Sequence, residues 1–282
     1  MPSRFLPVLL ALYFLFCLAT RAAERVISLA PNLTEIICAI GAADQLAGRT
    51  SVCDYPPEPL KQVPVIGNFG APSLEKLVAA RPTLVVDVAL EDESIARRIT
   101  TLGLRHERVP CRVLDDIPVA IRRLGVLLRR ETAAEPLAAQ LAGGIAAARK
   151  TAAAQTNAPR VYAEIWSDPP MTCGRKTFLA ELITLAGGKN IGDAAERDYF
   201  AISTEWLLAR QPDVALCFYM ADAAHLPERL AARPGWTALP AVKQKKVFGG
   251  FDNNLMLRPG PRALEALRAL RRCFQSVPPG AG

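Results

Sequence analysis

The sequence predicts an α/β protein made of two similar lobes with mainly parallel sheets, joined by a long helical spine. Three observations predict this class. Near-continuous apolar segments such as TLVVDV (83–88) are typical of parallel strands buried on both faces. Strand and helix patterns alternate in each half of the chain, which favours a parallel sheet. Residues 114–155, between the halves, show helical periodicity and no strand pattern.

The first lobe is predicted to span residues 24–115. Asn32 is expected to cap a helix whose third residue, Glu35, reaches back to form a capping box. The apolar residues of this helix lie on one face: Leu33, Ile36, Ile37 and Ile40. The predicted elements are, in order, strands over 25–30 and 46–52, a loop over 53–59 that proline keeps out of helix, a helix from Ser73 to about Ala80, a strand over 83–88, a helix over 95–104 and a strand over 105–111.

The spine, residues 116–156, is expected to be one long helix or two abutting helices. Pro136 and the pair Gly143-Gly144 are candidate bends. The second lobe, residues 157–282, restarts the first pattern. Its predicted elements are a strand over 160–166, a helix within 180–191, a helix and strand over 203–216, a strand within 242–250 and a terminal helix over 261–274.

An internal repeat connects the two lobes. SLEKLVAARPTLVV (73–86) returns as STEWLLARQPDVAL (203–216), with Ser, Glu, Leu, Ala and Pro in register. TEIICAIGAADQL and AELITLAGGKNI form a second similar pair in the same order. Two matched units in one order indicate a duplication. Each copy of the first unit places a glutamate, Glu75 or Glu205, in the first turn of its helix.

The N-terminus reads as an export signal. Arg4 precedes the apolar run FLPVLLALYFLFCLA, and small residues follow, so residues 1–23 are predicted to be a signal peptide. A lipid anchor at Cys17 is disfavoured because the large Phe16 precedes it. The mature chain is therefore expected to be soluble and outside the cytoplasm. Its net charge of +7 is spread along the chain without a basic block interleaved with aromatics, so no nucleic-acid partner is expected.

The cysteines and histidines carry no metal pattern. Six cysteines follow the predicted signal, none spaced as Cys-x-x-Cys and none near a histidine. In an exported protein one to three disulfides are expected. Cys217–Cys273 is the predicted pair, because the terminal helix should pack on the strand that holds Cys217. His106 and His225 are expected at the surface, and neither a metal site nor an intrinsic cofactor is predicted.

Several motifs together resemble a known family. RVISLAPNLTEI, CDYPP, NFGAPSLEKLVAARPTLVV, DPPMTCGRKTFLAELITLAGGKNI and ISTEWLLARQPDV, with RPGPR near the end, are similar to the periplasmic substrate-binding proteins of metal-chelate ABC importers. The most similar branch is the cobalamin-binding (BtuF-like) one. The resemblance covers nearly the whole mature chain. It implies two lobes on one long helix with limited closure, a periplasmic location and no enzymatic activity.

The resemblance also implies partners. In that family a glutamate at the tip of each lobe docks onto arginines of the permease, and the matching positions here are Glu75 and Glu205. A carboxylate in the first helical turn is favoured by the helix dipole and can meet an Arg fork. We therefore expect a monomer that binds a small-molecule metal chelate and delivers it to an ABC permease with its ATPase.

The ligand is expected between the lobes, where loops follow the strands. A corrinoid such as cobalamin is a flat, amphipathic ring bearing amides and a phosphate, so it needs apolar walls and a few polar anchors. Arg258 matches the family's polar anchor, and its guanidinium could hold a phosphate or an amide oxygen. The complete set of predicted ligand-binding residues is Asn32, Tyr55, Phe69, Trp166, Tyr199, Asn254 and Arg258.

Departures from the branch keep other ligands open. Phe69 and Tyr199 stand where that branch tends to place tryptophans, and Val52 and Val88 occupy two further positions. The disulfide seen in that branch would need a cysteine at Ala186. Haem or an iron-siderophore is the alternative ligand. Haem is disfavoured because no well-placed histidine exists, although Tyr55 or Tyr199 could ligate iron.

An exported thiol enzyme is the alternative from another class. Cys53 and Cys173 fall in loops expected to face the cleft. A nucleophilic cysteine needs a lowered pKa and usually a histidine base, and neither histidine falls in such a loop. The sequence also has no hydrolase or phosphate-loop motif. The binding-protein interpretation is therefore favoured.

Overall fold

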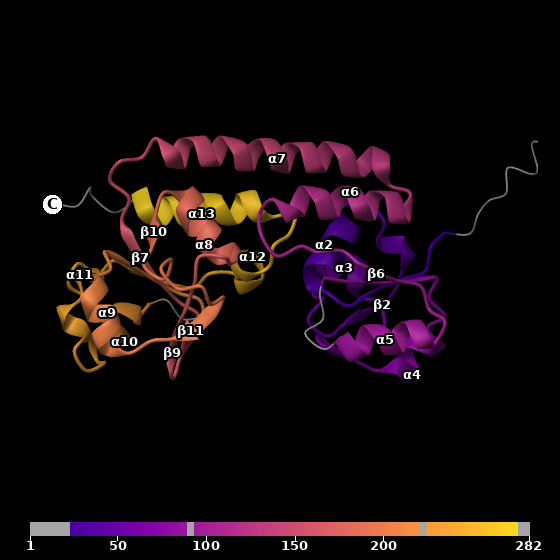
Figure 1. Cartoon of the computed structure of the whole chain (residues 1–282), viewed down its shortest axis with the longest axis horizontal. Coiled ribbons are helices and arrows are strands. Elements are labelled where there is room, and N and C mark those ends of the chain that lie inside the picture. The colour runs from indigo at the N-terminus through magenta and orange to yellow at the C-terminus, as the bar shows by residue number, and fades with distance from the viewer. Residues whose placement is uncertain (1–22, 89–92, 220–223, 276–282) are drawn as a thin grey trace, which may run out of the picture.

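A computed structural model of the chain describes residues 23–88, 93–219 and 224–275. The predicted signal peptide therefore lies outside the described residues, apart from Ala23. Figure 1 shows two α/β lobes side by side, with α7 (Glu131–Ala153) running across one side of both. None of the described helices is long and apolar enough to cross a membrane. The predicted α/β class is confirmed.

The first lobe is built on one six-stranded sheet with the order β4-β3-β2-β1-β5-β6. All neighbours are parallel except β3 and β4. Its strands are β1 (Val26–Ser28), β2 (Leu46–Thr50), β3 (Val65–Asn68), β4 (Ala71–Pro72), β5 (Leu84–Asp87) and β6 (His106–Arg108). Its helices are α2 (Pro31–Ala39), η1 (Ala43–Gln45), α3 (Pro57–Leu60), α4 (Leu74–Ala79) and α5 (Glu93–Thr101).

The second lobe has a parallel sheet with the order β10-β7-β12-β13 and a smaller antiparallel sheet with the order β11-β9-β8. Its strands are β7 (Arg160–Glu164), β8 (Trp166–Ser167), β9 (Pro170–Cys173), β10 (Lys189–Asn190), β11 (Tyr199–Ala201), β12 (Val214–Cys217) and β13 (Val247–Phe248). Its helices are α8 (Phe178–Ala186), α9 (Thr204–Arg210), α10 (Leu226–Ala231), η2 (Trp236–Ala238), α11 (Pro240–Lys243), α12 (Asn253–Leu257) and α13 (Ala263–Gln275).

The sequence repeat corresponds to a repeated topology. In their order across the sheet, β2-β1-β5-β6 of the first lobe matches β10-β7-β12-β13 of the second. Ser73 and Ser203 cap α4 and α9 through their hydroxyls. Each helix is followed by a residue with a left-handed backbone, Arg81 or Gln211, both with a φ of 46°. The same local unit therefore leads into the central strand that follows it in each lobe.

The spine consists of two helices that pack against each other, α6 (Asp116–Leu128) and α7. The expected alternative of two abutting helices is the one observed: the break falls at Arg129, which has a φ of 56°, and α7 runs unbroken through the candidate bends Pro136 and Gly143-Gly144. Gly144 instead permits close packing, since a Cβ there would lie 2.5 Å from the side chain of Leu264. At 1.5 Å per residue, the 23-residue α7 is about 35 Å long, long enough to pass over both lobes.

One large hydrophobic core runs through both lobes and the helical layer. The predicted apolar face of α2 is fully buried in this core. Val214 and Leu216 of β12 face it, together with α8 and α13, whereas Ala215 and Cys217 face a smaller core around Trp236. Successive strand residues point to opposite faces of the sheet. The helical layer thus joins the lobes by packing as well as by chain connection.

Three local predictions are wrong. The N-cap of α2 is Ala30, and Asn32 lies inside the helix without capping it. Residues 57–60 form the short helix α3, because proline is tolerated in a first helical turn. His106 is not a surface residue: its side chain is 9% exposed, and its Nε2 lies 2.8 Å from Oδ2 of the buried Asp87.

The predicted Cys217–Cys273 disulfide is also absent. Cys217 points into the smaller core, whereas Cys273 on α13 packs against the large core on the other face of the sheet. The prediction placed α13 on the correct sheet but did not consider which face each side chain occupies. None of the six cysteines after the predicted signal is disulfide-bonded in the structure.

Candidate functional site

A pocket of about 590 Å³ lies between the two lobes. The first lobe contributes residues from α2, from the β3–β4 turn and from the loops after β5 and β6. The second contributes the segments before α8 and β11 and the one after α12. The lining residues are Pro31, Asn32, Phe69, Val88, Cys111, Arg112, Lys176, Thr177, Phe178, Asp198, Tyr199, Leu257, Arg258 and Pro259.

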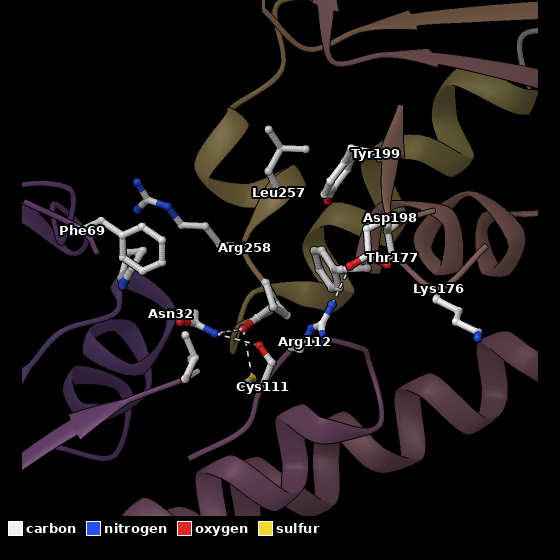
Figure 2. A pocket seen from close by; sticks show the side chains of 14 residues that line it. Asn32, Phe69, Cys111, Arg112, Lys176, Thr177, Asp198, Tyr199, Leu257 and Arg258 are labelled. Carbon is white, nitrogen blue, oxygen red and sulfur yellow. Dashed lines mark hydrogen bonds and ion pairs between the residues drawn. The ribbon is translucent and has the colours of Figure 1, made fainter. Parts of the chain in front are cut away.

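Two aromatic side chains face the pocket from opposite lobes. Phe69 lies in the two-residue turn between β3 and β4, where Gly70 takes a φ of 74°. Tyr199 begins β11. Figure 2 shows the two rings on opposite sides of the pocket. They are 51% and 44% exposed, which is high for large apolar side chains, so their ring faces are available to a ligand.

Asn32 lines the pocket and also joins the segments around it. Its Nδ2 donates to the carbonyl oxygens of Cys111 and Pro259, each at 3.1 Å. The Cys111 thiol donates to the same Pro259 oxygen at 3.2 Å. The segment after α12 is thereby fixed against the first lobe, although its chain comes from the second.

Arg258 projects beside the pocket from this fixed segment (Figure 2). Its NH1 donates to Oδ1 of Asp54 at 2.7 Å and lies 3.8 Å from Oε1 of Glu35. Partial burial alone would raise the pKa of Asp54, but the hydrogen bond and charge of Arg258 outweigh burial and lower that pKa below its ordinary value. The Arg258 side chain is 15% exposed and lines the pocket, so it remains within reach of a ligand.

The pocket is also lined by two cations that the sequence analysis missed, Arg112 and Lys176. Arg112 crosses from the first lobe to Asp198 of the second at 2.6 Å. Lys176 lies 3.0 Å from Glu196. A signal was present for Arg112, because it directly follows the predicted strand over 105–111, where ligand-binding loops are expected. Asp198 directly precedes the predicted ligand residue Tyr199.

Four of the seven predicted ligand residues line the pocket: Asn32, Phe69, Tyr199 and Arg258. The other three do not. The guanidinium of Arg262 lies 3.7 Å from the ring centre of Tyr55, which is 38% exposed but outside the lining. Asn254 donates to both carboxylate oxygens of Asp54 at 3.3 Å. Trp166 is 55% exposed on the antiparallel sheet, outside the pocket lining.

The repeated glutamates lie away from the pocket. Glu75 on α4 and Glu205 on α9 are both exposed. Both helices lie on the side of the molecule opposite α7, one in each lobe (Figure 1). The hydrogen bond from Ser203 holds the pKa of Glu205 below its ordinary value, which keeps this carboxylate charged.

The thiols do not have the environment of a nucleophile. Cys53 and Cys173, expected in cleft-facing loops, are fully buried. Burial raises the pKa of the Cys173 thiol to about 12. A nucleophilic cysteine requires the opposite shift.

Two α/β lobes that share a helical layer and enclose a pocket lined by both define a solute-binding protein. The model of the periplasmic binding protein family matches residues 26–252, and the chain belongs to this family. A vitamin B12-binding protein of Pectobacterium carotovorum is 28% identical, over 95% of this chain and 94% of its own length.

Solved structures are similar over the same extent. The periplasmic heme-binding protein RhuT of Roseiflexus sp. RS-1 is 32% identical, with a TM-score of 0.80 over 91% of this chain and 99% of that one. The periplasmic vitamin B12 binding protein BtuF of Vibrio cholerae is 25% identical, with a TM-score of 0.78 over 90% of this chain and 98% of that one. The family resemblance noted in the sequence is thus confirmed.

Proposed function

We propose that this chain is the periplasmic solute-binding component of an ABC importer and that it captures a corrinoid between its lobes for delivery to the permease. The observation that supports this proposal most is the pair of exposed rings, Phe69 and Tyr199, on opposite walls of the pocket. A flat ring inserted between them would contact one aromatic face from each lobe. The vitamin B12-binding names of the relatives support the same ligand class.

The polar groups of the pocket suit the edge of such a ring. Arg258 and Arg112 present donors, and Asp198 presents acceptors, within one apolar cleft. Few polar groups in a mainly apolar pocket are typical of small-molecule sites, because they fix orientation. A corrinoid edge bears amides, which both donate and accept hydrogen bonds.

Haem is the second candidate ligand, favoured by the similarity to RhuT. Tyr199 is the tyrosine that lines the pocket, whereas Tyr55 lies outside the lining. Burial raises the pKa of Tyr199 to about 12, so its deprotonation by a bound iron would cost more than that of an ordinary tyrosine. Neither histidine of the described chain lines the pocket.

Glu75 and Glu205 are proposed to dock the protein onto arginines of the permease. Both are exposed, and the helices that carry them, α4 and α9, lie one in each lobe away from α7. A carboxylate at this position suits an Arg fork, and two separated contacts would fix the orientation of the lobes on the permease. Neither lines the pocket, so docking and ligand binding use separate residues.

Titration of the purified mature protein with cobalamin and with haem tests this function. Full burial of a Phe ring contributes about 1.5–3 kcal/mol. Because about half of each residue is exposed, we expect Phe69→Ala and Tyr199→Ala each to weaken cobalamin binding by about 0.8–1.5 kcal/mol, roughly four- to twelvefold. Trp166→Ala removes an exposed ring outside the lining and serves as the control. Haem binding without corrinoid binding would refute the corrinoid assignment.

A further inference from the structure

Each of the three cations that line the pocket has a carboxylate partner. Arg258 is paired with Asp54 at 2.7 Å, Arg112 with Asp198 at 2.6 Å and Lys176 with Glu196 at 3.0 Å. These pairs come from different elements, and the Arg112 pair joins the two lobes. Glu196 is shared with Arg175, so the cations that the pocket presents with a carboxylate of their own are the two arginines.

The pair of Arg258 and Asp54 is held from several directions. Asn254 donates to both oxygens of Asp54, so the carboxylate is fixed by two neighbours. Glu35, which is 3% exposed, lies 3.8 Å from the same guanidinium. Glu35 accepts two hydrogen bonds from Arg262, so Asp54 is the main counter-charge of Arg258.

The interaction of a ligand with these arginine–aspartate pairs depends on the charge of the groups at its edge. Asp54 and Asp198 each accept from one nitrogen of their arginine, so a ligand carboxylate that reaches the remaining donors lies beside a like charge, and displacing the aspartate leaves that like charge nearby as well. A neutral amide can donate to the carboxylate and accept from the guanidinium without separating the pair. Pairing therefore favours amides and disfavours carboxylates.

We propose that Asp54 and Asp198 are specificity-determining residues, which make the pocket select flat rings with amide-bearing edges over rings with carboxylate-bearing edges. This inference rests on the proposed function, in which a corrinoid occupies the pocket. It adds that the carboxylate partners of the arginines set the discrimination between amide-bearing and carboxylate-bearing ligands. Asp198 lines the pocket, whereas Asp54, the partner of Arg258, lies outside the lining.

The test compares cobalamin with its monocarboxylic acids, in each of which one propionamide of the ring has been hydrolysed. The two probes differ by one amide and one charge. Dissociation constants are measured for both with wild type, Asp54→Asn and Asp198→Asn. The control is Asp44→Asn, which removes the same charge from the exposed pair with Arg130.

Wild type should bind the amide form more tightly than the acids. The dissociation constant of each acid divided by that of cobalamin measures this preference. In Asp54→Asn or Asp198→Asn that ratio should fall by about three- to tenfold for at least one acid, the size expected for one nearby, partly solvated charge. The ratio should be unchanged in Asp44→Asn. Corrinoid binding with the same ratio in wild type and both pocket variants would overturn the inference and leave the proposed function intact. Failure of wild type to bind any corrinoid would overturn both.

Discussion

Replacing Arg262 tests how the segment after α12 is held against the first lobe. Arg262 donates to Glu35 from Nε at 2.9 Å and from NH2 at 3.1 Å. Glu35 is 3% exposed and Arg262 15%, so solvent screens this pair little. The same guanidinium lies over the ring of Tyr55 and reaches Asp252 at 3.2 Å.

The burial of this ion pair determines how much stability its removal should cost. Removing one partner of a buried pair costs about 3–5 kcal/mol, because the other charge is left uncompensated. Loss of the contact with Tyr55 adds about 0.5–1 kcal/mol. We therefore expect Arg262→Ala to lower the free energy of unfolding by at least about 3 kcal/mol. Arg130→Ala, which removes the exposed pair with Asp44, should cost at most about 1 kcal/mol.

Urea denaturation followed by circular dichroism measures both variants. Burial raises the pKa of Glu35, and the hydrogen bonds from Arg262 oppose that shift. Without Arg262 the carboxyl should protonate more easily, so the stability lost in Arg262→Ala should shrink as the pH falls towards 4.5, its ordinary value. Adding Glu35→Gln should recover part of the loss, because a buried neutral amide needs no counter-charge. A loss below about 1 kcal/mol for Arg262→Ala would refute the reasoning.

Three further predictions concern docking, pH and thiol chemistry. The double variant Glu75→Ala, Glu205→Ala should weaken permease binding in a salt-sensitive way and leave cobalamin affinity unchanged. The control Glu131→Ala, at the start of α7, should change neither permease binding nor cobalamin affinity. Normal uptake by the double variant would reject docking. Because the pKa of Asp54 is lowered below 3.8 in the folded state, its stabilisation is full above that pH and is lost as the pH falls through the lower value. The difference in melting temperature between wild type and Asp54→Asn should therefore stay constant from pH 7 to about 5 and close in stronger acid; a gap that persists there would contradict the pairing. With a pKa of about 12, Cys173 should resist iodoacetamide at neutral pH until the protein unfolds, and rapid labelling of native protein, read by mass spectrometry, would count against its burial.

The repeated units could be read from the sequence because their signals are local. A serine cap, an apolar residue facing the core and a proline after the helix recur in SLEKLVAARP and STEWLLARQP, and both form capped helices before central strands. The apolar face of α2 was likewise predicted from spacing alone and is buried. These features depend on neighbours within a few residues.

The errors concern contacts between distant segments. Asn32 matches a capping pattern, yet its amide is taken by carbonyl oxygens of Cys111 and Pro259, the second more than 200 residues away. Glu35, the expected partner in that cap, is held by Arg262. The pair of Arg112 and Asp198 joins two lobes, so no local pattern could have predicted it.

Diffraction from crystals of the protein grown with cobalamin tests the central claim most directly. Cobalt scatters anomalously near its absorption edge, so its position can be found without assuming how the ligand is oriented. The account predicts one cobalt peak per molecule, between the rings of Phe69 and Tyr199. A cobalt peak elsewhere on the protein, or crystals grown at saturating cobalamin that show no cobalt in the pocket, would contradict it.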